Sequence, residues 1–327
     1  MTPPDLSVII VSWNVRARLL ACLASVRRHS GDLALQLLVV DNASSDGSAD
    51  AVARAAPDAE LIRNDENVGF ARAVNQGLDA ATGRHVLLLN PDVLLRDAVL
   101  PRSVALLDAE PDVGGLGCRV VDELGTDQPS AHAHPSLLNL ALVSSGLARL
   151  RAVPWLDRYE QLRRDPRTPR DVEVASGCFL MLRGEALRDV GPLDDRFFFC
   201  GEETDWCLRA RQRGWRIRFA PVGTIIHAGN ASGARLGSTR ALLLSRGLVE
   251  LHAKHGGVPA AAICWSLLAL HNLSRALAFG LHARVTGAPR SQALARHFAR
   301  VSRRFGESWI RGAWPRASQS ETAHTTA

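Results

Sequence analysis

Lysine is almost absent from the sequence, and this absence removes one class of nucleotide-binding protein. Lys254 is the single lysine among 39 basic residues, so no phosphate loop ending in Gly-Lys-Ser/Thr is present. A Gly-x-Gly-x-x-Gly pattern after the first predicted strand is missing as well. P-loop nucleotide hydrolases and dinucleotide-binding folds are therefore excluded, and any nucleotide bound here is held without a glycine loop.

Cysteine is present without the spacing of a metal site or a disulfide framework. The sequence has six cysteines and no Cys-x-x-Cys pair. Most of them lie in apolar runs, which predicts buried thiols in a reducing compartment. The first residues also lack a basic segment followed by a long apolar run, so no secretory signal is predicted there. We therefore expect a cytoplasmic active site.

Positive charge is concentrated toward the C-terminal end. From Arg284 onward arginines outnumber glutamates by eight to two, which accounts for the whole formal net charge of +6. A nucleic-acid-binding protein would instead carry this charge across a recognition surface interleaved with aromatic residues, so no nucleic-acid partner is expected. An anionic membrane surface fits such a segment better.

Apolar runs of strand length alternate with amphipathic stretches of helix length in the first half of the sequence. This order is typical of an α/β protein with a mainly parallel sheet flanked by helices. In such sheets ligands bind at the carboxyl ends of the strands. Strands are predicted over residues 6–12, 35–40, 60–63 and 85–89, and helices over residues 15–29, 48–55 and 71–81.

Polar clusters follow three of these strands. They are Ser12-Trp13-Asn14, the run from Asp41 to Ser48, and Asn90-Pro91-Asp92. Each alone is ordinary turn chemistry, but strand ends at one sheet edge would bring the three together. A carboxylate such as Asp41 can accept from a base N–H or a ribose hydroxyl, and one such as Asp92 can hold Mg²⁺ or Mn²⁺ beside a diphosphate. The combination predicts a site for a nucleotide sugar.

These motifs, together with Asn67-Val68-Gly69-Phe70-Ala71, resemble the family 2 glycosyltransferases of GT-A fold. The similarity extends over roughly residues 6–230 and points to the bacterial rhamnosyltransferase-like branch. It implies a Rossmann-like sheet with a C-terminal helical extension, a nucleotide-sugar donor and a divalent cation. The residues it assigns to donor binding are Ser12, Asn14, Asp41, Asp46, Asn67, Gly69, Asn75 and Asn90.

The metal-binding motif departs from the common family pattern. Asn90 stands where an Asp-x-Asp motif has its first aspartate, so Asp92 supplies the only carboxylate. One carboxylate binds a hard cation weakly, and the metal should then depend on the bound diphosphate and on a further ligand. The resemblance implies that His227 is this ligand, and a hydrogen-bonded histidine at a strand end is the alternative.

An acidic segment opens a predicted helix near residues 202–213. Glu202, Glu203 and Asp205 lie in its first turn, where the positive end of the helix favours carboxylates. An inverting transfer needs a carboxylate that takes the proton of the acceptor hydroxyl. The resemblance implies that Glu203 does so, with Glu202 as the alternative. Asp205 precedes Arg209 by four residues, so a structural ion pair is as consistent with its position as a catalytic role.

A glycine interrupts the predicted strand over residues 174–181. Such a glycine often marks the close approach of a ligand or of another backbone. The resemblance implies that Gly177 borders the acceptor, and a β-bulge would explain the glycine equally well. Residues 122–171, which contain five prolines, are expected to cover the acceptor side.

The pattern beyond residue 235 is helical. A helix is predicted over residues 239–255, ending at Gly256-Gly257. The next run, residues 260–281, is long enough to span a bilayer but has polar residues in its middle. Burial against the catalytic domain or in the membrane interface is therefore favoured for this run, and insertion in the bilayer remains open as the alternative.

An apolar stripe among arginines follows in residues 290–316. It predicts a basic amphipathic helix that lies on an anionic leaflet. The alternative is a helix packed on its own domain with a solvated basic face. The stripe consists of Leu294, Phe298, Val301, Phe305 and Trp309.

The predicted organisation is a catalytic domain over residues 1–235, a helical membrane-associating extension over residues 236–316 and a disordered tail over residues 317–327. Within the catalytic domain we expect a nucleotide-sugar half over about residues 1–121 and an acceptor half over about residues 122–235.

The functional hypothesis is an inverting glycosyltransferase, peripheral at the inner face of the plasma membrane. It would move a sugar, with rhamnose from dTDP-rhamnose favoured, to a lipid-linked or cell-surface glycan. Galactose, glucose and N-acetylglucosamine from UDP donors remain open. A catalytically inactive sugar-nucleotide-binding scaffold is the alternative from another class.

Overall fold

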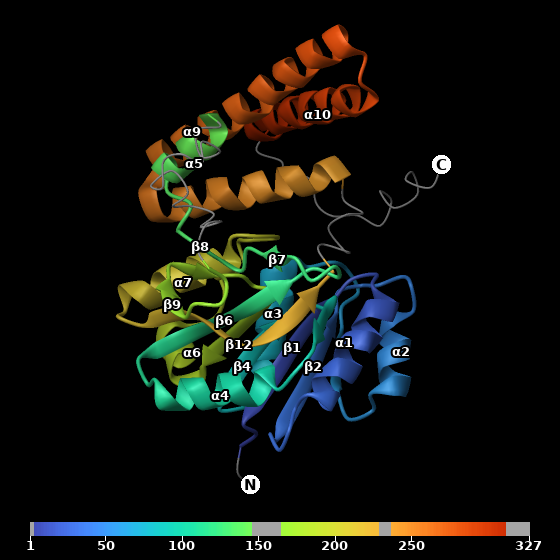
Figure 1. Cartoon of the computed structure of the whole chain (residues 1–327), viewed down its shortest axis with the longest axis vertical. Helices are drawn as coiled ribbons and strands as arrows, with labels where there is room; N and C mark the ends of the chain where they lie inside the picture. Colours follow the sequence, from blue (N-terminus) through green and yellow to red (C-terminus); the bar gives the residue numbers. More distant parts are fainter. Residues whose placement is uncertain (1–2, 146–164, 229–236, 312–327) are drawn as a thin grey trace. The chain divides into compact units, whose positions relative to one another are not determined.

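The computed structural model describes residues 3–145, 165–228 and 237–311 (Figure 1). The chain divides into two compact units. Of the described residues, the first unit contains 3–134, 165–198 and 202–228, and the second contains 135–145, 199–201 and 237–311. The predicted tail over residues 317–327 lies outside the described residues.

The first unit is built on one mixed sheet. Strands β1 to β4 are parallel neighbours, and β6 runs parallel to β12. Strand β11 is antiparallel to both β4 and β6, and it joins the two parallel parts. The main path of the sheet is β3 (Glu60–Arg63), β2 (Leu35–Asp41), β1 (Leu6–Ser12), β4 (His85–Leu89), β11 (Phe179–Arg183), β6 (Val113–Val121), β12 (Arg216–His227) and β5 (Val93–Leu95). The predicted α/β class with a mostly parallel sheet is confirmed.

Helices cover both faces of this sheet because its central strands are apolar on both sides. In β1, Val8 and Ile10 point into one hydrophobic cluster, and Ile9 and Val11 point into the other. The first cluster includes α1 (Arg16–Arg28), α2 (Ser48–Ala55) and α4 (Val99–Ala109). The second includes α3 (Phe70–Ala80), α6 (Gly184–Val190) and α7 (Glu202–Gln212). The three layers match the order of elements predicted for the first half.

Short strands complete the first unit. Strand β7 (Asp127–Gln128) pairs with β6, and β9 (Arg170–Val172) pairs with β12. Strands β8 (Ala131–His132) and β10 (Val174–Ala175) form a separate two-stranded sheet. Gly177 lies between β10 and β11, where the predicted strand is broken.

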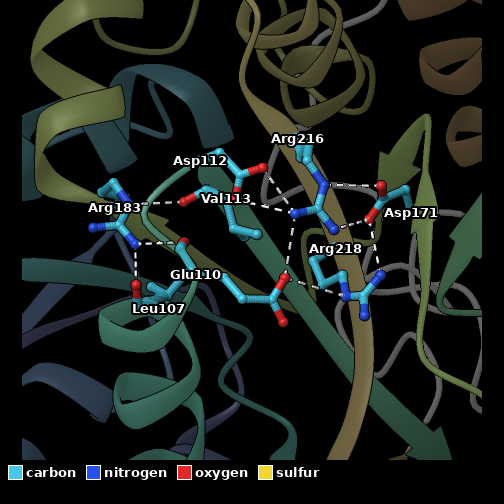
Figure 2. A network of polar contacts seen from close by, with 8 residues as sticks. All are labelled: Leu107, Glu110, Asp112, Val113, Asp171, Arg183, Arg216 and Arg218. Carbon is cyan, nitrogen blue, oxygen red and sulfur yellow. Dashed lines mark hydrogen bonds and ion pairs between the residues drawn. The ribbon is translucent and has the colours of Figure 1, made fainter.

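A network of hydrogen bonds and ion pairs lies at the end of the sheet where β6 and β12 begin (Figure 2). Arg183 is buried and donates to the carbonyl oxygens of Leu107 and Glu110 at the end of α4, and to that of Val113. These carbonyls have no partners within the helix, so a buried arginine completes their hydrogen bonding. Arg216, beside this cluster, pairs with carboxylates on both sides, Asp112 and Asp171.

The second unit is helical. It contains α5 (Leu137–Ser145), α9 (Gly237–Thr286) and α10 (Pro289–Arg311). Gly257 has φ 70° and ψ −170° inside α9, which breaks the helix at the position where the sequence predicts an end. Among the described residues, α9 is the one helix that is long and apolar enough to cross a membrane by length and composition.

The apolar stripe of α10 packs against α9. Phe305 stacks on Trp265 with ring centroids 5.5 Å apart, and Phe298 stacks on Phe279 at 5.9 Å. Val301 is fully buried. For these residues the structure therefore shows the alternative, a helix packed on its own unit with a basic outer face, and corrects the expectation that the stripe faces a leaflet.

Candidate functional site

The ends of β1 and β2 carry buried polar atoms that lack a partner. Ser12 and Asp41 are register partners at the last position of the two strands. Asp41 Oδ2 accepts from the Ser44 N–H at 3.0 Å, whereas Asp41 Oδ1 and Ser12 Oγ find no hydrogen-bond partner among the described residues. The indole N–H of Trp13 also lacks a hydrogen-bond partner among the described residues, and the motifs in the sequence gave Trp13 no role. A ligand or an ordered water completes the hydrogen bonding of buried atoms of this kind, and three of them adjoin one another in the sequence or in the sheet at these strand ends.

Asn14 shapes the loop beside these atoms. Its φ of 55° lies in the left-handed region, which asparagine tolerates better than most residues. Its Oδ1 accepts from the Ser45 N–H at 2.7 Å, and its own N–H donates to Ser44 Oγ at 2.9 Å. Asn14 therefore ties the loop after β1 to the loop after β2.

Asp46 holds the starts of two helices. Its carboxylate accepts from the N–H of Arg16 in α1 at 2.9 Å and from the N–H of Ser48 in α2 at 3.0 Å. Partial burial acts to raise the pKa of Asp46, but the hydrogen bonds from Ser48 and Arg16 outweigh it and keep the pKa below its usual value. These contacts are structural, and a donor-binding role for Asp46 stays a prediction.

Asn42 organises the amide cluster next to the site. Its Nδ2 donates to Asn67 Oδ1 at 2.9 Å, and its Oδ1 accepts from the Val68 N–H at 3.1 Å. Asn67 Oδ1 also accepts from the Gly69 N–H at 3.0 Å. The sequence pointed to Asn67 and missed Asn42, whose signal was its position directly after Asp41.

Gly69 and Asn75 connect this cluster to residues near position 195. A Cβ on Gly69 would lie 2.8 Å from the Phe198 ring, and its φ of 90° also favours glycine. Asn75 donates to the Leu193 carbonyl at 2.8 Å and accepts from the Leu193 N–H at 3.1 Å. Both residues hold the local fold, and their predicted contact with a donor remains a prediction.

The predicted metal ligands lie side by side. Asp92 Oδ1 is 3.3 Å from His227 Nε2, although the two residues are far apart in the sequence. Asn90 Nδ2 is 3.5 Å from the same nitrogen. His227 ends β12 and pairs with Val93 in β5, so the sheet itself brings the histidine to the Asn90-Pro91-Asp92 turn.

Gln128 fixes the orientation of the His227 ring. Its Nε2 donates to the His227 carbonyl at 3.1 Å, which turns its Oε1 toward His227 Nδ1 at 3.3 Å. An amide oxygen only accepts, so Nδ1 carries a proton and Nε2 faces Asp92. In the neutral ring, Nε2 then offers a lone pair beside Asp92 Oδ1, and the two atoms together would suit a divalent cation.

The chemistry of this pair fits a divalent cation. A carboxylate oxygen and an imidazole nitrogen are suitable ligands for Mn²⁺, and a carboxylate oxygen suits Mg²⁺. No group of three or more His, Cys, Asp or Glu residues that could hold a metal occurs in the described ranges. Asp92 and His227 would thus provide two ligands. The buried Cys178 thiol nearby stays neutral, because burial and the charge of Asp92 raise its pKa to about 11.

The two glutamates that open α7 have different environments. Glu202 is buried, and its Oε2 has no hydrogen-bond partner in the part of the chain that the structure describes. Burial, followed by the charge of Glu203, raises the pKa of Glu202 well above its usual value. Glu203 is half-buried, and its Cγ is 3.6 Å from the position of a Cβ on Gly177. A neutral Glu202 is a poor proton acceptor, so this arrangement favours Glu203 as the base.

Asp205 has a structural environment. Its side chain is fully buried and accepts from Arg209 Nε at 2.8 Å. Arg209 in turn donates to the carbonyls of Val190 and Pro192 at 2.7 and 2.8 Å. The structure thus contains the ion pair that the spacing indicated, and it links α7 to the segment after α6.

Comparisons with known proteins agree with these features. The family model described as glycosyl transferase family 2 matches residues 7–191. The N-acetylglucosaminyl-diphospho-decaprenol L-rhamnosyltransferase of Mycobacterium tuberculosis is 29% identical over 278 residues, which cover 80% of this chain and 89% of the relative. The pre-mycofactocin glycosyltransferase of the same organism is 27% identical over 224 residues, covering 68% of this chain and 42% of the relative.

A solved structure shares the fold. The mannosyltransferase of Pyrobaculum calidifontis, determined with GDP-Man and Mn²⁺, superposes with a TM-score of 0.53 at 19% identity, covering 95% of this chain and 88% of that one. At this identity the likeness shows the fold alone. It confirms the GT-A fold that the motifs implied.

Proposed function

Because the chain belongs to glycosyl transferase family 2 and is rhamnosyltransferase-like, we propose that it transfers L-rhamnose from dTDP-rhamnose to a sugar on a polyprenyl diphosphate. The observation that carries the proposal is the set of unpartnered buried atoms at the ends of β1 and β2, on the sheet edge that also bears the Asp92 and His227 pair. The transferred sugar and the lipid-linked N-acetylglucosamine acceptor follow the name of the mycobacterial relative, and dTDP as the carrier follows the resemblance to the rhamnosyltransferase-like branch.

The nucleoside would bind at the ends of β1 and β2. Asp41 Oδ1 is a buried acceptor suited to a base N–H, and Ser12 Oγ can donate or accept. The indole N–H of Trp13 adds a donor that a carbonyl oxygen of the base or a ribose oxygen would satisfy. Asn14, Asp46 and Asn42 would keep the loops around this pocket in place.

Asp92 and His227 would hold the divalent cation, and Gln128 would keep His227 Nε2 directed at it. The cation supplies charge neutralisation for the leaving diphosphate. Asn90 Nδ2 lies beside the same ring and is a donor that suits a phosphate oxygen. The missing first aspartate of the motif is thus compatible with metal use, provided that the donor completes the ligand set.

Glu203 would act as the general base. The acceptor hydroxyl attacks the anomeric carbon of rhamnose while the bond from that carbon to the diphosphate breaks, and its proton passes to the Glu203 carboxylate. Attack from the side opposite the leaving group inverts the anomeric configuration. Gly177 leaves space beside Glu203 in which the acceptor sugar would bind.

The place of action would be the cytoplasmic face of the plasma membrane. A polyprenyl diphosphate acceptor resides in a bilayer, so the enzyme must reach the interface. The second unit supports this, since α9 has the length and composition of a membrane-binding helix and arginines of α10 are exposed. We propose a peripheral association of this kind.

The test is product formation by the purified full-length protein. It would be incubated with Mg²⁺ or Mn²⁺ and with an acceptor in which N-acetylglucosamine is joined through a diphosphate to a short prenyl chain. The donors tested would be dTDP-rhamnose, UDP-glucose, UDP-galactose and UDP-N-acetylglucosamine, one at a time. We expect dTDP release and a disaccharide of inverted anomeric configuration with dTDP-rhamnose. No release of nucleoside diphosphate from any donor would refute the proposed activity. Release from a donor other than dTDP-rhamnose would refute rhamnose as the transferred sugar.

A further inference from the structure

Helix α9 carries a row of exposed large apolar side chains after the break at Gly257. They recur at spacings of mostly three, four and seven residues and occupy an arc of about 120° on the helix. Leu270 and Leu277 are 61% and 66% exposed. The members of this leucine row are Ile263, Leu270, Leu273, Leu277, Leu281 and Val285.

The packing of α10 leaves the row uncovered. After the break at Gly257, the α9 residues that contact α10 include Trp265 and Phe279, by ring stacking, His271, by an edge contact with Phe298, and His282, by a hydrogen bond to Ser291. On a helix with 3.6 residues per turn, these positions lie within about 60° of the direction opposite Leu277. The row therefore points away from the hydrophobic cluster of the second unit. An exposed apolar strip of this length indicates a surface that contacts another body.

We propose that the leucine row is the surface through which the protein contacts an anionic lipid bilayer. The inference rests on the proposed function, because a lipid-linked acceptor requires the enzyme at a membrane. Residues 237–311 contain ten arginines and one lysine, against Glu250 and Glu307. A second copy of the chain would bring two strongly positive units together, whereas anionic lipids attract this charge.

The geometry makes the contact interfacial. The same segment of α9 packs its opposite face on α10 through Trp265 and Phe279, so only the row is free to meet lipid. A helix that offers one apolar face to lipid lies in the plane of the interface. Insertion of the row would bury leucine side chains among the acyl chains while the opposite face stays packed on α10. This resolves the question that residues 260–281 left open, since one face packs in the unit and the other is free for lipid.

The arginines of α10 lie on the far side of the helix pair. Arg296, Arg300 and Arg303 are exposed on the face opposite Phe298 and Phe305, which contact α9. They are thus about one helix diameter, roughly 10 Å, farther from the bilayer than α9, a distance similar to the Debye length in physiological salt. The contact expected from residues 290–316 therefore moves to α9. Apolar burial of the row should supply most of the binding, and the positive charge of the second unit, acting over about a Debye length, should favour anionic over neutral lipid.

The experiment measures co-sedimentation of the full-length protein with vesicles of phosphatidylglycerol and phosphatidylcholine. The double variant Leu270→Ser/Leu277→Ser should lose at least about tenfold in partitioning, because each buried leucine contributes on that order. Leu124→Ser is the matched control, since Leu124 is 91% exposed in the first unit, and it should bind as the unchanged protein does. The triple variant Arg296→Gln/Arg300→Gln/Arg303→Gln should lose less than about threefold at physiological salt.

Three results would overturn the proposal. The first is unchanged vesicle binding by the leucine double variant. The second is loss of binding by the arginine variant alone. The third is a dimer in solution that the leucine variant separates, with no vesicle binding by the parent, which would make the row an interface between copies.

Two further measurements keep the test decisive. If circular dichroism shows that the double variant is unfolded, Leu277→Trp replaces it, and its fluorescence should be quenched by brominated lipids, in contrast to Leu124→Trp. Transfer to the short-chain, water-soluble acceptor should be the same for the double variant and its parent. Absence of transfer in every protein would remove the proposed function while leaving the vesicle result to stand.

Discussion

The central sheet has two edges at the ends of its strands, one where β6 and β12 begin and one where β1 and β2 end. The hydrogen bonding of the polar groups differs between these two edges. Where β6 and β12 begin, Arg183 donates to three carbonyls and Arg216 pairs with Asp112 and Asp171, while Arg218 Nε beside them has an ion pair with Glu110 at 3.8 Å and no hydrogen bond among the described residues (Figure 2). Where β1 and β2 end, Ser12 Oγ and Asp41 Oδ1 have none among the described residues. Complete pairing stabilises a fold, whereas buried atoms left unpaired cost stability unless a ligand binds. This contrast favours the edge where β1 and β2 end as the place of the reaction.

The largest effect is expected from Glu203→Gln at the unpaired edge. Removal of the base should lower kcat about a thousandfold, while the Kd of the donor changes less than about twofold. Turnover assays and calorimetric titration of dTDP-rhamnose measure the two quantities. Glu202→Gln is the matched control and should retain most of the activity, because burial favours the protonated form of Glu202. Equal losses in both variants would contradict the assignment.

Arg183→Met should produce the largest stability effect at the paired edge. It removes the Arg183 donor from the carbonyls of Leu107 and Val113 and one of two donors from that of Glu110, and the free energy of unfolding should fall by about 3 kcal/mol. Urea denaturation measures this loss, and the KM of the donor should not change. A variant with normal stability, or with a raised KM, would mean that the two edges are less distinct than the hydrogen bonds indicate.

Gln128→Leu should weaken metal binding by about tenfold, since the partners that orient a metal-binding histidine typically have this effect. The probe is Mn²⁺, titrated by calorimetry or electron paramagnetic resonance in the presence of dTDP, whose diphosphate completes the ligand set. Gln212→Leu, at the exposed end of α7, is the control. If the Gln128→Leu variant binds Mn²⁺ as tightly as the parent while Asp92→Asn binds it more weakly, Gln128 is not required to orient the His227 ring.

The smallest effects concern pH, and they have opposite signs at the two edges. Hydrogen bonds from Arg216 lower the pKa of Asp171, so its contribution to stability is present above the ordinary aspartate pKa and is lost as the pH falls through the folded-state value. Burial raises the pKa of Glu202, so ionisation of the unfolded chain makes folding less favourable as the pH rises above the ordinary glutamate value.

Melting curves of two variants measure this difference. Asp171→Asn should be less stable than its parent at neutral pH, by less than about 1 kcal/mol because the pair is half exposed, and equal to it in acid. Glu202→Gln should equal its parent in acid and become more stable than it as the pH rises. Curves that shift in parallel at every pH would contradict both pKa directions.

The sequence predicted strands β1 to β4 and the residues at their ends, because each depends on local hydrophobic patterning and short motifs. It did not predict β6, whose run Val113–Val121 contains three glycines and so lacks the composition typical of a strand. It did not reveal Gln128, whose partner His227 is 99 residues away. Nor did it reveal Arg183, whose carbonyl partners lie 70 to 76 residues earlier. Such pairs are determined by sheet order, which no local pattern contains.

The helices of the second unit show the same limit in another form. Periodicity correctly gave α10 an apolar face, but the partner of that face could be a leaflet or another helix. Phe279 and Trp265 of α9 cover it. A pattern of apolar residues thus identifies a buried face without identifying what buries it.

The place of β11 in the sheet has a consequence for biosynthesis. This strand lies between β4 and β6, so the first four strands and β6 are joined only when residues 179–183 have been made. At a translation rate of about 5 to 20 residues per second, β4 lacks its partner β11 for roughly 5 to 20 seconds after its own synthesis. During that time the nascent chain presents an open apolar strand, a template for pairing with other chains. Chaperone contact with the ribosome-bound chain should therefore be concentrated between the emergence of β4 and that of β11.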